Sequence, residues 1–272
     1  MQRRKGIMIV PLLVAGLVML SQFFHSEKVV NPETGKAARV ALSSDQEDAL
    51  GLQSYREVLS QARVIESGPA HDTVVRVASR ITPTTGSAAN TFHWQVSVVE
   101  SDQVNAFCLP GGKIVVYTGI LPYTKNEAAL AAVIGHEVAH AVARHGSQRL
   151  LRTSLANTFM MGAAASLSMS DMDNQQRRAA MAALGAGAQY GLVLPFSREH
   201  ESEADRMGLL YMARAGYDPR EAIEFWRRMS SQNHAGQPPE FASTHPSDAT
   251  RIRDLEAFMP QALAEYEKSA PR

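Results

Sequence analysis

The chain has 272 residues, of which 45% are hydrophobic, and this length suits one large domain or two small ones. Its 27 basic and 27 acidic residues give a formal net charge of zero, so no basic excess indicates nucleic-acid binding. The single cysteine, Cys108, excludes an intrachain disulfide, and the cysteine content therefore does not identify the cellular compartment.

The N-terminus carries the pattern of an export signal or a membrane anchor. Basic residues at positions 3–5 precede an almost uncharged run over residues 6–24, close to the roughly 20 residues that span a bilayer. The run lacks a small-x-small cleavage pattern at its exit, which favours an anchor over a cleaved signal peptide. We expect a signal anchor or signal peptide over residues 1–25, a linker over 26–43, and the remainder outside the cytoplasm.

Residues 44–146 are predicted to form two helices, three short strands and a third helix, in that order. A capping box at 44–47 predicts a helix to about residue 65, and a second amphipathic helix follows Gly68-Pro69. Three segments are rich in residues that favour β-strands, and together they predict a small antiparallel sheet. The segments are residues 92–100, 104–109 and 113–118. A second capping box at 124–127 opens a mostly apolar helix, for which Gly146 is a natural stop.

The second half of the chain is predicted to be helical. Two apolar segments over residues 153–194 favour an ordinary packed helical pair, with a lid or membrane-touching element as the alternative. The acidic stretch after Ser197 reads as a solvated helix start, although Ala204 and Gly208 would let this helix approach another closely. Further helices are expected after Asp218-Pro219 and after the sequence Ser-Thr-His-Pro at 243–246.

Two histidines four residues apart flank a glutamate in the stretch His136-Glu137-Val138-Ala139-His140. Residues four apart on a helix lie on one face, and Glu137 borders that face because it is three residues before His140. The pattern supplies two zinc ligands and a base for the water that a catalytic zinc activates. Because unpartnered polar groups are costly on an otherwise apolar helix, the sequence predicts a hydrolytic zinc site here.

A hydrolytic zinc site needs one more protein ligand than this motif provides. The downstream continuation Gly-x-x-His of other zinc peptidases is missing from residues 141–146. Spacing alone does not choose among the candidates, which are Glu199, Glu201, Glu203, His145, His200 and His245.

Three stretches together resemble zinc metallopeptidase family forty-eight: HEVAH at 136–140, ESEAD at 201–205 and THP at 244–246. This family includes prenyl, mitochondrial inner-membrane and bacterial periplasmic proteases. The similarity covers about residues 45–258, including the segment before the active-site helix. The resemblance implies that Glu201 is the third metal ligand and that Asp205 orients a ligand histidine.

The resemblance also assigns the remaining roles. It implies that Glu137 is the general base, that His245 stabilises the transition state or regulates the site, and that Arg251 is the family's arginine after that histidine. We expect an extended polypeptide to add to an edge strand over 104–109 or 113–118. The predicted substrate contacts are Asn105, Ala106 and Phe107.

These features predict a mainly helical α+β, zincin-like metallopeptidase domain over residues 44–272 that holds one zinc ion per chain. We expect it to cleave unfolded or misassembled envelope polypeptides in the bacterial periplasm, attached to the membrane by its N-terminal segment and without nucleic acid. One alternative is a zinc-stabilised periplasmic chaperone or binding module, which has no use for Glu137. The other, a membrane-embedded processing enzyme, needs several long spans, whereas this chain offers one firm candidate and one doubtful one.

Overall fold

A computed structural model of the protein describes residues 9–188, 194–232, 240–245 and 249–269. Contacts between residues divide the chain into two units, and the predicted domain over residues 44–272 contributes to both. Unit 1 comprises Met1–Val30, Ala37–Ser43 and Gly146–Glu199, and unit 2 comprises Asn31–Lys36, Ser44–His145 and His200–Arg272.

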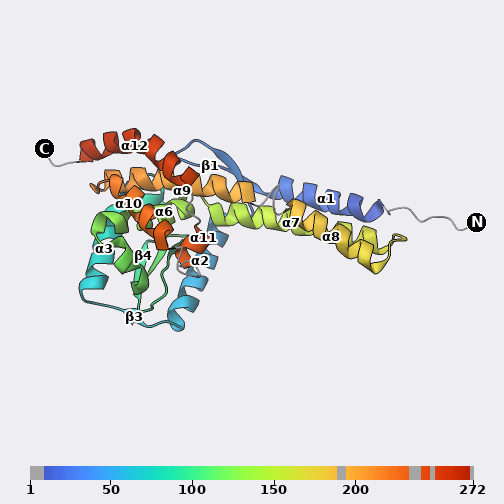
Figure 1. The fold of residues 1–272 in the computed structure, drawn as a ribbon, viewed down its shortest axis with the longest axis horizontal. Helices are drawn as coiled ribbons and strands as arrows, with labels where there is room; N and C mark the ends of the chain where they lie inside the picture. Colours follow the sequence, from blue (N-terminus) through green and yellow to red (C-terminus); the bar gives the residue numbers. More distant parts are fainter. Residues whose placement is uncertain (1–8, 189–193, 233–239, 246–248, 270–272) are drawn as a thin grey trace, which may run out of the picture. The chain divides into compact units, whose positions relative to one another are not determined.

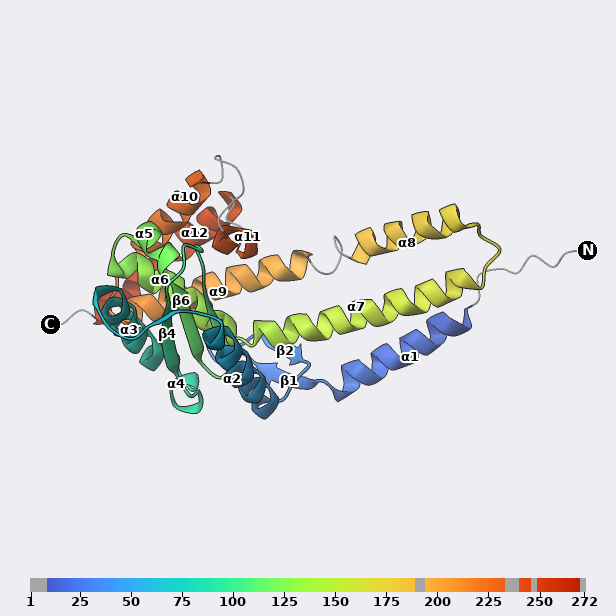
Figure 2. The same ribbon diagram turned by 90° about the horizontal axis from the view of Figure 1, so that it is seen from below.

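Unit 1 is built from helices and one β-hairpin. Its elements are α1 (Val10–His25), β1 (Glu27–Val30), β2 (Ala37–Val40), α7 (His145–Ser168), whose first residue belongs to unit 2, and α8 (Asn174–Ala188). Helices α1 and α7 lie side by side in both views (Figures 1 and 2), because Gly162 of α7 has no side chain to hold them apart. A Cβ atom at Gly162 would lie 2.4 Å from the Cβ of Ala15.

Large apolar side chains are exposed along α1, among them Leu13, Leu17 and Phe24. Among the described residues, no helix combines the length and the apolarity that crossing a membrane requires. The predicted anchor begins in residues 1–8, which lie outside the described part of the chain. The segment predicted as a linker contains the antiparallel hairpin β1–β2, with Val30 opposite Ala37.

Unit 2 holds a four-stranded sheet and most of the helices. Its first elements are α2 (Ser44–Ser60), β3 (Val64–Ile65), α3 (Pro69–Ile81), η1 (Thr82–Thr84), α4 (Ala88–Thr91), β4 (Gln95–Val99), β5 (Ala106–Leu109), β6 (Lys113–Tyr117), η2 (Thr118–Ile120) and α5 (Leu121–Thr124). They are followed by α6 (Glu127–Val142), α9 (Leu194–Arg214), which begins in unit 1, α10 (Arg220–Gln232), α11 (Glu240–Thr244) and α12 (Ala249–Ser269).

The sheet has the strand order β3-β4-β6-β5 and is mixed. Strand β6 pairs antiparallel with β5 but parallel with β4, so the expectation of antiparallel pairing does not extend to the β4–β6 pair. The three predicted strands and the α+β class are confirmed. Strand β6, the predicted strand over residues 113–118, lies between β4 and β5 and has no open edge. Strand β5 is therefore the one of the two predicted template strands that lies at an edge.

Alternation along β6 assigns the two faces of the sheet. Ile114 and Val116 join the main core with α3 and α6, whereas Val115 joins a smaller cluster with Tyr55 of α2. Figure 1 shows α2 and α3 on opposite sides of the sheet. Helix α6 therefore lies against the sheet with almost every side chain buried, as its apolar composition predicts.

The ends of α6 differ from the prediction by a few residues. Asn126, rather than Thr124, is the N-cap residue, and its side chain accepts a hydrogen bond from the amide of Ala129 at 2.8 Å. Helix α6 stops at Val142 because Arg144 adopts a left-handed backbone conformation with φ of 57°, so Gly146 is not the stop. This turn starts α7 at His145.

Candidate metal centre

Helices α6 and α9 approach closely at two glycines, as the small residues of α9 predict. A Cβ at Gly208 would lie 2.9 Å from the backbone nitrogen of His136, and one at Gly135 would lie 3.0 Å from the carbonyl oxygen of Gly208. Both positions are packed against backbone, which cannot move aside easily. This contact brings the acidic residues of α9 next to the histidines of α6.

We expect Gly208→Ala to separate the two helices and to lower both stability and metal affinity. Overpacking of this kind costs about 1–3 kcal/mol of unfolding free energy. The control is Gly187→Ala in α8, where an added Cβ meets no atom within 4 Å and the better helix former should be neutral or slightly stabilising. Thermal unfolding and zinc titration measure both effects, and equal stability of the two variants would contradict the account.

Four side chains bring ligand atoms to one point. One atom each from His136, His140, Glu201 and His245 lies within 4.8 Å of the others, and the group is buried or half-buried. His136 and His140 come from α6, Glu201 comes from α9, and His245 directly follows α11. The structure thus brings together three helical segments that are far apart in sequence.

The spacing of the two histidine nitrogens and the Glu201 carboxylate matches a tetrahedral zinc site. Zinc–ligand bonds of about 2.0–2.1 Å at tetrahedral angles separate neighbouring ligand atoms by about 3.3 Å. The Nε2 atoms of His136 and His140 lie 3.1 Å apart. Glu201 places Oε2 at 3.3 Å from the first nitrogen and Oε1 at 3.3 Å from the second.

The charge balance of this group also fits a cation. Burial and the positive charge of Arg251 oppose protonation of His136, but hydrogen bonds to Asp205 and Glu201 outweigh them and raise its pKa to about 9. The carboxylates therefore attract positive charge at this point, and a divalent cation can supply it in place of the proton. Burial lowers the pKa of His140 well below its usual value, which keeps that imidazole neutral as a ligand must be.

Glu137 lies beside the donor atoms on the same helix. Burial raises the pKa of its carboxyl group, against the opposing charges of His245 and His136. In the described part of the chain, its Oε1 atom has no well-aligned hydrogen-bond partner, although Nε2 of His245 lies 3.3 Å away. A buried carboxylate oxygen without a full partner suits a group that exchanges protons with water or substrate.

His245 connects Glu137 to the donor group. Its Nδ1 atom lies 3.0 Å from Oε2 of Glu201 and 3.1 Å from Nε2 of His136. The backbone amide of His245 donates to the carbonyl of Phe241, which holds the residue at the end of α11. Residue 246 of the THP stretch lies outside the described residues.

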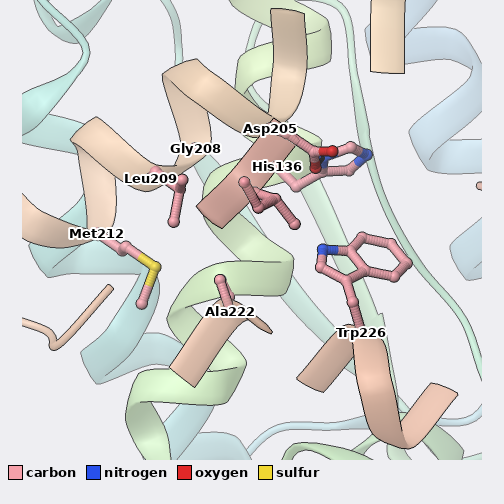
Figure 3. A pocket seen from close by; sticks show the side chains of 9 residues that line it. His136, Asp205, Gly208, Leu209, Met212, Ala222 and Trp226 are labelled. Atoms are coloured by element: carbon pink, nitrogen blue, oxygen red, sulfur yellow. Dashed lines mark ion pairs between the residues drawn. The ribbon is translucent and has the colours of Figure 1, made fainter. Parts of the chain in front are cut away.

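Asp205 and Arg251 hold His136 from the opposite side. Oδ1 of Asp205 lies 3.0 Å from Nδ1 of His136, and Arg251 donates to both oxygens of Asp205 at 2.6 and 2.7 Å. The guanidinium of Arg251 lies 3.6 Å from the centre of the Trp226 ring. Figure 3 shows His136, Asp205 and Trp226 among the side chains that line a small pocket. Sequence reasoning missed Trp226, for which the aromatic pattern of α10 gave no functional signal.

The other candidate ligands do not join the donor group. His145 contacts Nδ1 of His140 at 2.9 Å, and its ring stacks on that of His200. Glu203 is buried and turned toward His145, whereas Glu199 is exposed. The acidic stretch lies inside α9 and not at its start, so the reading of a solvated helix start is wrong for the buried carboxylates.

The predicted substrate contacts lie at β5 and the residue before it. Ala106 pairs with Val116 and Phe107 with Val115 on β6, while the side chain of Asn105 accepts from the amide of Ala106 at 2.9 Å. Strand β5 packs against α6, the helix that carries the histidines. An extended chain added to this edge would therefore pair with a strand that contacts the histidine-bearing helix.

The chain is similar to known peptidases over most of its length. Residues 70–259 match the model of peptidase family M48. The mitochondrial metalloendopeptidase OMA1 of Schizosaccharomyces pombe is 38% identical over 251 residues, which cover 91% of this chain and 70% of that protein. The beta-barrel assembly-enhancing protease of Yersinia pestis is 31% identical over 225 residues, which cover 82% of this chain and 46% of that protein.

The resemblance inferred from three short motifs is confirmed by these matches. The matched residues 70–259 include the whole donor group, and the similarity to the yeast protein extends over most of both chains. The chain belongs to peptidase family M48 and is a zinc-dependent metalloendopeptidase.

Proposed function

We propose that the enzyme holds one zinc ion through His136, His140 and Glu201 and cleaves unfolded or misassembled envelope polypeptides. The observation that carries this assignment is that the Nε2 atoms of His136 and His140 lie 3.1 Å apart, each 3.3 Å from one oxygen of the Glu201 carboxylate, beside the buried carboxylate of Glu137. Four protein side chains reach this point, so the number of ligands does not exclude a structural zinc site, but such a site needs no adjacent base. Peptide hydrolysis is the chemistry that uses both the metal ligands and the adjacent base.

Glu137 carries the proton transfers of the proposed reaction. When bound, zinc lowers the pKa of water and polarises the scissile carbonyl. Glu137 accepts the proton of the attacking water and later gives it to the leaving amine. The burial that raises the pKa of this carboxyl group makes it a better proton acceptor than an exposed glutamate.

His245 is proposed to assist at the carbonyl oxygen. Its ring lies between Glu137 and Glu201, at 3.3 and 3.0 Å, from where an N–H group can stabilise developing negative charge. Its Nδ1 atom also lies among the four donor atoms, so it competes for the position that water or substrate needs. The proposed second role of His245 is therefore to regulate access to the site.

The proposed substrate is an extended polypeptide that pairs with β5 through Asn105, Ala106 and Phe107. Main-chain pairing recognises any unfolded segment and gives loose sequence preference. The name of the Yersinia pestis relative refers to β-barrel assembly, and β-barrel proteins occupy outer membranes. Misassembled proteins of the bacterial envelope are the substrate class that fits both observations.

The proposed location is the periplasmic side of the inner membrane. Basic residues at positions 3–5 followed by an apolar run support export, and the exposed apolar side chains of α1 support contact with lipid. Fractionation of cells, with intact mass of the native protein, checks the location and separates an anchor from a cleaved signal peptide.

We expect the purified protein to cleave reduced, unfolded casein, to lose activity with a chelator, and to regain it when zinc is added back. Folded proteins without exposed extended segments should resist cleavage, because β5 needs a free backbone to pair with. Gel analysis of the products measures both. Zinc-bound protein that holds casein without cutting it would instead indicate the chaperone alternative.

A further inference from the structure

The ring of His140 has a second nitrogen that faces away from the donor group. This atom, Nδ1, lies 2.9 Å from Nδ1 of His145, which is almost fully buried. A ligand histidine that binds metal through Nε2 carries its proton on Nδ1, and the partner of that proton sets the orientation of the ring. His145 is thus the group that receives the outer hydrogen bond of His140.

Glu203 holds the far side of His145. Its Oε2 atom lies 3.4 Å from Nε2 of His145, and its Oε1 atom accepts from the side chains of Asn31 at 2.7 Å and Thr34 at 2.8 Å. Glu203 is only 8% exposed, so its charge needs such partners. Asn31 is equally buried, with 8% of its surface exposed, although it belongs to a turn.

The turn over residues 31–36, the tip of the hairpin β1–β2, is held firmly on α9. Backbone hydrogen bonds of 2.9 Å join Asn31 to Gly35 and to Lys36 and close the turn. The carboxylate of Glu33 binds Arg214 of α9 through both oxygens, at 2.9 and 3.0 Å. All of these residues belong to unit 2, together with the donor group.

We propose that this turn positions the metal ligand His140 through Glu203 and His145. The inference rests on the proposed ligand set and adds three positioning residues to it, His145, Glu203 and Thr34. None of them joins the four donor atoms. Each acts by fixing the next side chain, so the turn before α2 determines how His140 faces the metal.

The direction of the hydrogen bonds is consistent along the whole series. With the metal on Nε2, His140 donates from Nδ1 to Nδ1 of His145, which leaves the proton of His145 on Nε2, facing Glu203. Asn31 and Thr34 are donors, so Glu203 accepts from both and from His145, and the ammonium of Lys36 lies 3.5 Å from its Oε2 atom. A carboxylate at the end of the series makes the His140 ring a stronger ligand.

The test compares zinc affinity and ligand geometry in isosteric variants of the full chain. Glu203→Gln removes the carboxylate, and Thr34→Val removes one donor to it while keeping the shape of the side chain. Zinc dissociation constants come from competition with a chromogenic chelator, and the visible spectrum of the cobalt-loaded protein reports the ligand geometry. Glu199→Gln, an exposed position on α9, is the matched control.

We expect the dissociation constant for zinc to rise about 10- to 100-fold in Glu203→Gln, the range seen when outer partners of ligands are removed. Thr34→Val should raise it by about 3- to 10-fold, because Asn31 still donates to Glu203. Thr34→Ser keeps the hydroxyl and should restore the wild-type value, and Glu199→Gln should not change it. The cobalt spectrum should shift in the first two variants alone.

Folded Glu203→Gln and Thr34→Val variants with wild-type zinc affinity and cobalt spectrum would overturn this inference while leaving the proposed function intact. A wild-type chain that binds no zinc would overturn both. If Glu203→Gln does not fold, the comparison of Thr34→Val with Thr34→Ser decides, since a purely structural contact would change stability but not the cobalt spectrum.

Discussion

Replacing Glu137 with glutamine should abolish peptide cleavage and leave zinc binding unchanged. The amide has nearly the shape of the carboxylate but cannot accept the proton of the attacking water. Loss of a general base lowers turnover by about 10²- to 10⁴-fold. Because Glu137 is buried and burial raises the pKa of its carboxyl group, removing the charge should also leave thermal stability equal or higher.

The measurement is single-turnover cleavage of an unfolded substrate by variant and wild-type protein with equal zinc content. The control is the zinc stoichiometry of the variant, which should stay at one per chain. Cleavage at the wild-type rate by fully loaded Glu137→Gln protein would remove Glu137 as the base and move the proton transfer to another group, with His245 the nearest titratable candidate.

Glu201→Ala should release the metal, since it takes one of the three proposed ligands away. We expect zinc affinity to fall by more than about 100-fold, beyond the effect of losing an outer partner of a ligand. The matched control, Glu199→Ala, lies half a turn earlier on α9 at an exposed position and should keep its zinc. Metal analysis after dialysis against a weak chelator measures both.

A second comparison separates ligand loss from unfolding. Glu201→Ala also removes the carboxylate that neighbours Arg251, at 3.3 Å, and the histidines of α6. The circular dichroism spectra of the metal-free variant and of the metal-free wild-type protein should therefore agree, which shows that the variant is folded, before their zinc contents are compared. If folded Glu201→Ala protein kept its zinc and Glu199→Ala protein lost it, Glu201 would not be the third ligand.

The elements that the sequence predicted well are those defined by local patterns. The β-formers of β4, β5 and β6 and the apolar face of α3 depend on alternation and helical period, which neighbouring residues determine. The pairing of β4 with β6 in parallel does not depend on such a pattern. The parallel pairing requires β5, which lies between β4 and β6 in the sequence, to sit at the edge of the sheet, where it packs against α6.

The histidine pair of the site was predictable because one helix holds it. The third donor was not, because the distance between Glu201 and His136 depends on how closely α9 approaches α6. Gly135 and Gly208 allow that approach, and only the small residues of α9 hinted at it. Spacing along α9 left three glutamates equivalent, and it was the family resemblance that favoured Glu201.

The proposed roles of His145 and Glu203 could not be predicted from neighbouring residues either, because they too depend on how distant segments pack. A left-handed residue at Arg144 turns the chain between α6 and α7, so that His145 faces the outer nitrogen of His140 and not the donor group. Sequence rules place such a turn at glycine, and the neighbouring Gly146 therefore misdirected the prediction.

The most direct test of the zinc site is a crystal structure of the zinc-loaded protein with anomalous data collected at the zinc absorption edge. We predict one strong peak per chain, with bonds of about 2.0–2.2 Å to Nε2 of His136, Nε2 of His140 and a carboxylate oxygen of Glu201. A zinc peak bound elsewhere, with these three side chains free of metal in the loaded crystal, would contradict the account.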